Sequence, residues 1–173
     1  IKNVVKNNSR ILDVGCENGE LLKFLDKGKK IDGRGLELTQ KNVNICVKHG
    51  LSVIQGDADK DLISYSSKSF DFVILSQTLQ ATHSPENVLN QLVRISEHAI
   101  VSFPNFGSWS VRLKLLINGV MPRSKSLPHT WYTTPNIHLC SINDFKKLCN
   151  KNSIKIKKSF YLNKNGKEIT NPL

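Results

Sequence analysis

Three acidic side chains stand where the first three strand-like segments of the sequence end. Asp13 precedes a turn that holds two glycines, Glu37 ends the second segment, and Asp57 follows the third. The carboxyl ends of parallel strands meet at one edge of a sheet, which is where open α/β folds bind ligands. We therefore expect the three carboxylates to line one pocket. The alternative is that each acid caps the helix that follows its strand.

The turn after the first strand reads Asp13-Val-Gly15-Cys16-Glu17-Asn-Gly19, a DxGxxxG pattern. A dinucleotide-binding turn would have GxGxxG, with a pyrophosphate on the helix N-terminus. An acid before the first glycine instead suits a ligand with an ammonium group and no phosphate. Glu37 is placed where a carboxylate accepts hydrogen bonds from a ribose diol, and Asp57 is placed to accept from an adenine amino group.

The elements that would position these acids alternate between strands and helices, a pattern typical of a parallel α/β sheet. We predict strands at 10–14, 31–38, 51–55, 70–76, 99–103 and 155–161. Helices are predicted at 20–27, after an N-cap at Thr39, from Ser84-Pro85-Glu86 onwards, at 109–118 and at 142–150, the last behind a capping box of Ser141 and Asp144. The residues expected on the apolar helix faces include Leu21, Leu22, Phe24, Leu25, Val43, Cys46, Val47, Val88, Leu89, Leu92, Val93, Val111, Leu115 and Leu116.

The whole chain, residues 1–173, is predicted to form a single domain. Its 39% of hydrophobic and 23% of charged residues are typical of a globular domain of this length. The segment 104–140 is irregular and contains aromatic residues. We predict that it forms a lid or insert, because long loops inside compact domains usually bind ligands.

The net charge of +11 comes almost entirely from the C-terminal part of the chain. Residues 104–173 hold 12 Lys or Arg against 2 Asp or Glu, whereas residues 1–103 hold 13 against 12. Lys outnumbers Arg by 20 to 5, although phosphate-binding surfaces usually rely on Arg and interleaved aromatics. We interpret the excess as solvated surface charge. An acidic protein partner and a nucleic acid are the alternatives.

No apolar run is long enough to span a bilayer, so we expect neither a membrane segment nor a signal peptide. The cysteines form no CxxC pair and no His/Cys ligand pair. We therefore expect neither a metal site nor a disulfide framework. We expect a cytoplasmic protein. The cysteines are Cys16, Cys46, Cys140 and Cys149.

Four longer motifs, in addition to the acidic residues, carry information about the family of this sequence. They are Gly50-Leu-Ser-Val-Ile-Gln-Gly-Asp57, Phe70-Asp-Phe-Val-Ile-Leu-Ser-Gln-Thr-Leu-Gln-Ala-Thr82, Val101-Ser-Phe-Pro-Asn-Phe-Gly107 and Thr134-Pro-Asn-Ile-His-Leu-Cys140. From Arg10 to Phe160 the sequence resembles the MetW family of methionine biosynthesis proteins, which is similar to the class I S-adenosylmethionine-dependent methyltransferases. The resemblance implies a Rossmann-like class I methyltransferase fold, with a mostly parallel central sheet flanked by helices. The final strand of that fold is expected to be missing from this chain.

The resemblance also implies S-adenosylmethionine as cofactor and S-adenosylhomocysteine as product. The methionine end is expected on the glycine turn, the ribose on Glu37, and the adenine on Asp57 and the Ala58 backbone. Ser76 and Gln77 would close the pocket. The complete implied set is Asp13, Gly15, Cys16, Glu17, Gly19, Glu37, Leu38, Asp57, Ala58, Ser76 and Gln77.

Glu17 departs from the family, which has a glycine at this position of the turn. Glycine allows close backbone approach and unusual φ angles, whereas glutamate adds a Cβ atom and a negative charge beside the cofactor's carboxylate. Glu17 could turn to solvent, or pair with the ammonium or sulfonium group. It could also weaken binding by about 1 kcal/mol or more.

Asn105, Tyr132 and His138 lie in segments expected to overhang the cofactor's methyl group. His138 could be a general base there, within a small-molecule site shaped by aromatic side chains. The alternative is that His138 hydrogen-bonds the backbone and the aromatic rings pack on the sheet. Gln77-Thr-Leu-Gln80 stands in place of the Asn-Pro-Pro-aromatic motif of nucleic-acid amine methylases, which argues against that class.

Two functions remain. The resemblance implies an S-adenosylmethionine-binding, methyltransferase-like protein that acts with homoserine O-acyltransferase in methionine biosynthesis. The alternative is a stand-alone S-adenosylmethionine-dependent methyltransferase with a small-molecule acceptor. No catalytic acid/base pair is apparent, but methyl transfer from a sulfonium mainly needs in-line positioning, so this absence does not decide between them.

Overall fold

The computed structural model describes residues 1–124, 127–163 and 165–170. The chain divides into two compact units, Ile1–Phe103 and Pro104–Leu173. The prediction of a single domain with an insert at 104–140 stays a prediction.

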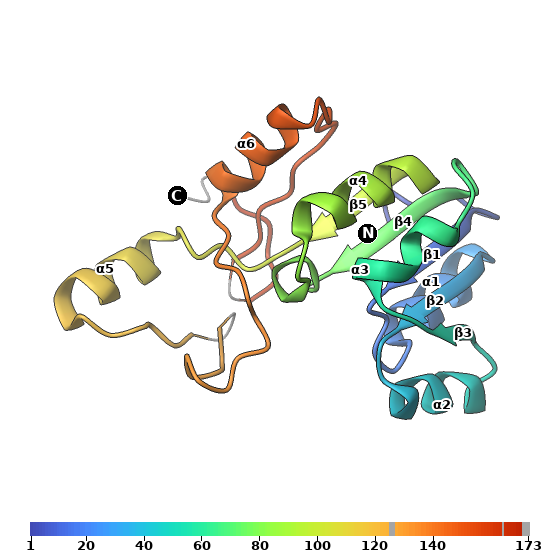
Figure 1. Cartoon of the computed structure of the whole chain (residues 1–173), viewed down its shortest axis with the longest axis horizontal. Coiled ribbons are helices and arrows are strands. Elements are labelled where there is room, and N and C mark those ends of the chain that lie inside the picture. The colour runs from blue at the N-terminus through green and yellow to red at the C-terminus, as the bar shows by residue number, and fades with distance from the viewer. Residues whose placement is uncertain (125–126, 164, 171–173) are drawn as a thin grey trace. The chain divides into compact units, whose positions relative to one another are not determined.

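The first unit is built on a five-stranded sheet whose strands all run parallel (Figure 1). The spatial order is β3-β2-β1-β4-β5, so the progression of the chain across the sheet reverses between β1 and β4. Ligands bind beside such a reversal in doubly wound folds, at the carboxyl ends of the strands. The predicted parallel α/β fold is confirmed. The strands are β1 (Arg10–Val14), β2 (Asp32–Glu37), β3 (Ser52–Gln55), β4 (Phe70–Ser76) and β5 (Ser96–Ser102).

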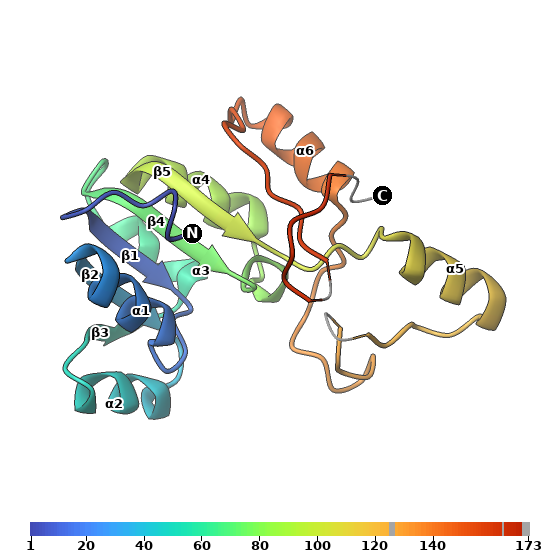
Figure 2. The ribbon, with the colours of Figure 1, turned by 180° about the vertical axis from the view of Figure 1, so that it is seen from behind.

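Helices cover both faces of this sheet. They are α1 (Glu20–Lys29), α2 (Gln40–Lys48), α3 (Ala58–Asp61) and α4 (Pro85–Ile95), with short 3-10 helices at Leu62–Ser64 and Leu79–Ala81. α1 lies on one face, and α3 and α4 lie on the other (Figures 1 and 2). α2 shares a buried apolar cluster with α1 and β3 through Val43 and Cys46. The central strand β4 is therefore covered on both sides, which explains its nearly continuous apolar sequence.

Some predictions about the first unit were wrong in detail. β5 begins at Ser96 instead of at 99, because α4 ends at Ile95 and Ser96 pairs directly with Phe70. Phe24 and Val47, both expected to face the core, are more than half exposed. Each stands at the margin of an apolar stripe, where periodicity alone does not separate buried from exposed positions.

The second unit contains α5 (Trp109–Asn118) and α6 (Ile142–Lys151), close to their predicted ranges. The predicted capping box of α6 is confirmed: the Asp144 amide donates to Ser141 Oγ and the Ser141 amide donates to Asp144 Oδ2, each at 3.2 Å. Leu115 and Leu116, which were expected to face the core, are exposed, and only Val111 of α5 is buried. None of the helices in the described part of the chain is long and apolar enough to cross a membrane.

The sixth strand predicted at 155–161 is absent from the described residues. Ile156 and Phe160 of this run are exposed. A strand is stabilised by cross-strand pairing, and this lysine-rich run joins no sheet within the described residues. Only its end is tied to a neighbour: the Ile169 amide donates to the Tyr161 carbonyl at 2.8 Å, beside an isolated bridge between Leu162 and Glu168. The predicted lead-in to a final strand falls partly on residues 164 and 171–173, which lie outside the described residues.

Candidate functional site

The turn between β1 and α1 is held close to two other parts of the first unit. The Gly15 amide, at φ +72°, donates to the Leu36 carbonyl of β2 at 2.8 Å. A Cβ atom on Gly15 would lie 2.7 Å from Thr78 Oγ1, just after β4. The backbone conformation and the close approach both require glycine at this position.

Cys16 and Gly19 contribute to this turn through their backbones. The Cys16 thiol packs in the core with Cys46 and Val53, and a Cβ atom on Gly35 would lie 2.6 Å from Cys16 Sγ. Burial raises the pKa of the Cys16 thiol well above its usual range. Gly19, at φ +76°, is the N-cap of α1. The thiol is therefore a core group.

Asp13, at the end of β1, is only 2% exposed. Its carboxyl group accepts no hydrogen bond from the described residues. Burial, and then the negative charges of Glu17 and Glu37, raise its pKa from 3.8 to about 7. The carboxyl group thus has unused capacity to bind a cationic or hydrogen-bond-donating ligand atom.

Glu37, at the end of β2, is buried and accepts four hydrogen bonds. Its Oε1 accepts from the Thr39 amide (3.0 Å), the Thr39 hydroxyl (2.8 Å) and Asn42 Nδ2 (3.1 Å), while Oε2 accepts, among the described residues, only from the Glu17 amide (2.9 Å). Oε2 can accept one further hydrogen bond. Thr39 occupies the predicted N-cap of α2, but its hydroxyl serves Glu37 instead of the helix.

Glu17 adopts the left-handed backbone region, with φ +49°. Its carbonyl accepts a hydrogen bond from Cys46 Sγ at 3.3 Å, and its amide is bound to Glu37 as described above. The backbone at this position is therefore held at both ends in a conformation that favours glycine. Side chains with a Cβ atom pay about 1–2 kcal/mol there.

Replacing Glu17 should separate its charge from its backbone strain. We expect both Glu17→Gly and Glu17→Gln to lower the pKa of Asp13, because each removes a neighbouring negative charge. At pH 8 both variants should raise the free energy of unfolding, because a lower folded-state pKa of Asp13 reduces the cost of its buried charge, and Glu17→Gly should raise it further, by up to about 1 kcal/mol, because glycine also relieves the positive φ. Carboxyl-carbon NMR titration and urea unfolding measure the two effects. An unchanged Asp13 pKa in both variants would contradict this account.

Asp57, after β3, has a structural role in the described part of the chain. Its Oδ1 accepts from the Asp59 amide at 2.9 Å and caps α3, as the helix-cap alternative predicts, and its Oδ2 lies 3.3 Å from Lys60 Nζ. Ala58 begins α3. The Gly56 amide donates to the Glu37 carbonyl at 3.0 Å, which brings this loop beside the end of β2. Leu38 directly follows β2, and this apolar residue is 63% exposed.

Ser76 ends β4, and both Ser76 and the following Gln77 are bonded to β5. Ser76 Oγ lies 3.2 Å from Ser102 Oγ, and the Gln77 amide, at φ +57°, donates to the Ser102 carbonyl at 2.9 Å. The adjacent Thr78 reaches the glycine turn. Sequence reasoning missed Thr78, as it missed the contacts of Thr39 and Asn42 with Glu37, because no local pattern reports contacts between loops of different strands.

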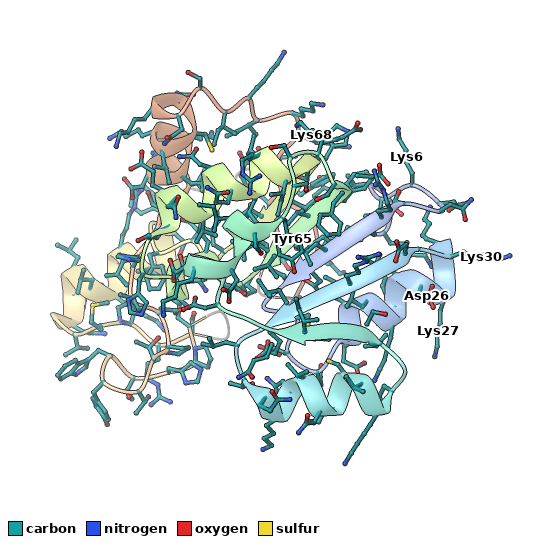
Figure 3. All side chains as sticks on the ribbon, turned by 45° about the vertical axis from the view of Figure 1, so that its right-hand side comes forward. Lys6, Asp26, Lys27, Lys30, Tyr65 and Lys68 are labelled. Carbon is teal, nitrogen blue, oxygen red and sulfur yellow. The ribbon has the colours of Figure 1, made fainter. Side chains whose placement is uncertain are left out.

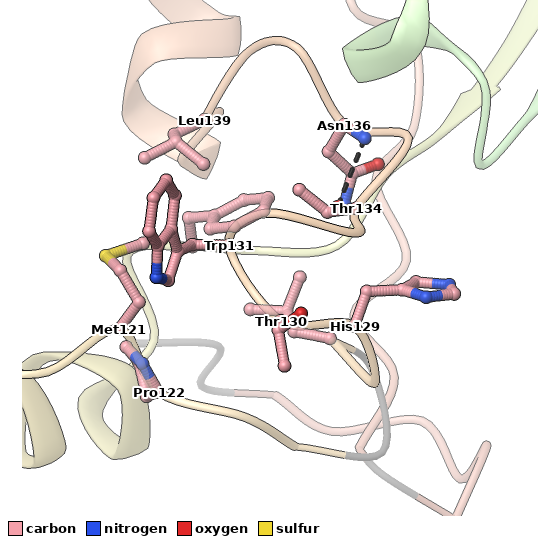
Figure 4. A pocket seen from close by; sticks show the side chains of 10 residues that line it. Met121, Pro122, His129, Thr130, Trp131, Thr134, Asn136 and Leu139 are labelled. Carbon is pink, nitrogen blue, oxygen red and sulfur yellow. Dashed lines mark hydrogen bonds between the residues drawn. The ribbon is translucent and has the colours of Figure 1, made fainter.

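The three substrate-pocket candidates lie in the second unit. Asn105 Oδ1 accepts from the Gly107 amide at 2.9 Å, Tyr132 packs edge-on against Trp131, and His138 is exposed. None of the three lines the cavity of about 210 Å³ in this unit. That cavity is mainly apolar (Figure 4), with walls that include Phe106, Met121, Pro122, Trp131 and Leu139.

Comparisons with known proteins agree on one family and one fold. The family model "Methionine biosynthesis protein MetW" matches residues 1–172. Among curated proteins, the chain is similar to the "Bifunctional methionine biosynthesis protein MetXA/MetW" of Rhodopirellula baltica, with 32% identity over 157 residues. The match covers 86% of this chain but only 25% of that relative. The chain thus spans about a quarter of the relative's length.

Solved structures show the same fold at lower identity. A SAM-dependent methyltransferase from Archaeoglobus fulgidus superposes with a TM-score of 0.68 at 19% identity, over 90% of this chain and 66% of that one. A SAM-dependent methyltransferase from Aquifex aeolicus superposes with a TM-score of 0.64 at 18% identity, over 94% of this chain and 79% of that one. The predicted Rossmann-like class I methyltransferase fold is therefore confirmed.

Proposed function

Because this chain belongs to the MetW family of methionine biosynthesis proteins, we propose that it binds S-adenosylmethionine and acts with a homoserine O-acyltransferase. The observation that carries the cofactor assignment is the buried Asp13 carboxyl group, which no described residue satisfies. A carboxylate in that state fits the ammonium group of the cofactor's methionine end.

The other residues of the carboxyl edge fit the remaining parts of the cofactor. Glu37 Oε2, with one hydrogen bond from the Glu17 amide, would accept from a ribose hydroxyl. Asp57 and the Ala58 backbone would hold the adenine, beside the exposed apolar Leu38. Ser76 and Gln77 would close the pocket. When bound, the cofactor supplies an activated methyl group on its sulfonium.

The partner assignment is supported by the name of the Rhodopirellula relative, in which MetXA and MetW are parts of one bifunctional protein. Joining two activities in one chain raises their effective concentration for each other. We propose that the present chain contacts the acyltransferase as a separate protein. The concentration of positive charge in residues 104–173 favours a partner with an acidic face.

The test is to add the chain to a purified homoserine O-acyltransferase from the same organism. We expect the two to coelute in size-exclusion chromatography and the acyl-transfer rate to change when the chain is present. We also expect S-adenosylmethionine to modify that change, and the Asp13→Asn variant to coelute without responding to the cofactor.

Failure to coelute, together with an unaltered acyl-transfer rate, would contradict the partnership. Multiple-turnover release of S-adenosylhomocysteine by the chain alone, with a small-molecule acceptor, would instead establish the stand-alone methyltransferase.

A further inference from the structure

A cavity of the first unit lies at the edge of the sheet opposite to the candidate site, where β1, β2 and β4 begin. It measures about 390 Å³, which is within the range of about 300–1,000 Å³ of small-molecule sites. Its walls include Arg10, Asp32, Arg34, Tyr65 and Ser69. None of these residues belongs to the set assigned to S-adenosylmethionine.

The two arginines of this cavity are only weakly engaged. Arg10 pairs with Asp32 in the β1–β2 register, and Arg34 lies two residues further along β2, so the three side chains share one face of the sheet. Arg34 Nη2 is 3.6 Å from Asp32 Oδ2, and Arg10 Nη2 is 3.8 Å from Asp71 Oδ1. Both distances exceed those of hydrogen bonds. Within the described ranges, neither guanidinium donates a hydrogen bond.

Arg94, in contrast to Arg10 and Arg34, uses its guanidinium group in hydrogen bonds within the protein. Its guanidinium donates to the carbonyls of Leu62 (3.0 Å) and Tyr65 (2.8 Å) and so fixes the loop that forms one wall of the cavity. Figure 3 shows Tyr65 and Lys68 on this loop, ahead of β4. The Tyr65 ring packs against Phe70 with centroids 5.7 Å apart. The wall is therefore held independently of Arg10 and Arg34, which stay available to a ligand.

Ser69 adds an unsatisfied group to the same wall. Its hydroxyl is buried and has no hydrogen-bond partner among the described residues. Buried hydroxyl groups without a partner are rare in native structures. The charged groups of the cavity are thus two guanidinium donors and the Asp32 carboxylate. A ligand with an oxyanion alone would be repelled by Asp32, whereas a ligand with both charges would be complementary to all three groups.

We propose that this cavity binds a small zwitterion of the α-amino-acid class. The carboxylate is held by Arg10 and Arg34, and the ammonium group faces Asp32. Two guanidiniums suit a carboxylate because their planar donor arrays match its oxygens. The site lies at the other edge of the sheet from Asp13, so it does not depend on the function proposed above.

The test is nitrogen-15 NMR of the whole chain, titrated with a mixture of the standard amino acids and L-homoserine, each at about 1 mM. Saturable shifts are expected at the amides of residues 64–70, and one amino acid should reproduce them alone. Arg34→Gln should weaken binding at least tenfold, through lost hydrogen bonds to a charged group. The matched control Lys27→Gln removes one positive charge from α1 outside the cavity walls and should bind as the parent does.

Inorganic phosphate and propionate serve as oxyanions without an ammonium group. Binding of either as strongly as the amino acid would overturn the zwitterion assignment. Shifts confined to residues 15–19 would place the amino acid on the cofactor turn and overturn the second site. No saturable shift with the mixture, or undiminished binding in Arg34→Gln, would overturn it as well.

Discussion

The Asp13→Asn variant should be more stable than the parent chain at pH 8 and should lose its affinity for S-adenosylmethionine. The folded chain holds the Asp13 pKa near 7 instead of 3.8, so between these pH values the native state binds a proton that the unfolded state has released. The free energy of unfolding therefore falls as the pH rises from about 4 to about 7. Since a tenfold difference in proton affinity corresponds to ~1.4 kcal/mol, removing the buried charge should recover about 2–4 kcal/mol at pH 8.

Urea unfolding at pH 5 and at pH 8 measures this effect. The parent should lose stability between the two conditions, and Asp13→Asn should lose much less. Asp26→Asn, in the exposed last part of α1, is the matched control and should follow the parent. Equal losses in the parent and in Asp13→Asn would show that Asp13 is not the titrating group. A gain in stability with a loss of binding is typical of residues kept for function.

Gly15→Ala should destabilise the chain by about 2–4 kcal/mol, which combines the cost of a left-handed φ with overpacking. The added Cβ atom would meet Thr78 Oγ1 at 2.7 Å and Thr78 Cγ2 at 3.0 Å. Thr78 is branched at Cβ and donates to the Ser76 carbonyl at 2.9 Å, so it has little freedom to move aside. Gly50→Ala is the matched control, with φ +75° and no atom within 4 Å of the new Cβ. It should cost only about 1 kcal/mol.

The double variant Gly15→Ala/Thr78→Ala separates the two contributions. Shortening Thr78 should restore the part of the stability lost to the contact, while the part lost to φ remains. The double-mutant cycle should therefore show a favourable coupling of 1 kcal/mol or more, as expected of residues in direct contact. Equal losses in Gly15→Ala and Gly50→Ala, without coupling to Thr78, would contradict the packing of the turn against the loop after β4.

Much of the fold could be predicted from local patterns. The apolar run of β4, the turn after Asp13 and the capping box of Ser141 and Asp144 each carry their structural reason within a few residues. The predicted strand at 155–161 failed because its alternation of Lys and apolar residues has the right period but no partner strand. The hydrophobic period is a property of a single segment, whereas a strand is stabilised by pairing with a second strand.

The strand-end positions of the acids in the candidate site could be predicted from the sequence, and the partners of these acids could not. The DxGxxxG turn and the strand ends are the basis on which Asp13, Glu37 and Asp57 were selected as candidates. That Glu37 is already bound by Thr39 and Asn42, and that Asp13 is bound by no described residue, depends on how loops from different strands meet. The departure at Glu17 was visible in the sequence, and the structure adds that this residue has φ +49° and that its amide is bound to Glu37.

Calorimetric titration of S-adenosylmethionine and S-adenosylhomocysteine into the whole chain at pH 8, where Asp13 is ionised, tests the central claim most directly. We predict one site of micromolar affinity for each ligand, tighter in Glu17→Gly and weaker in Asp57→Ala. Lowering the pH below 7 should weaken S-adenosylmethionine binding in the parent, because Asp13 must then release a proton. The absence of binding heat from both ligands in the parent chain would contradict the claim, and recovery of that heat only in Glu17→Gly would show that this chain has lost its cofactor.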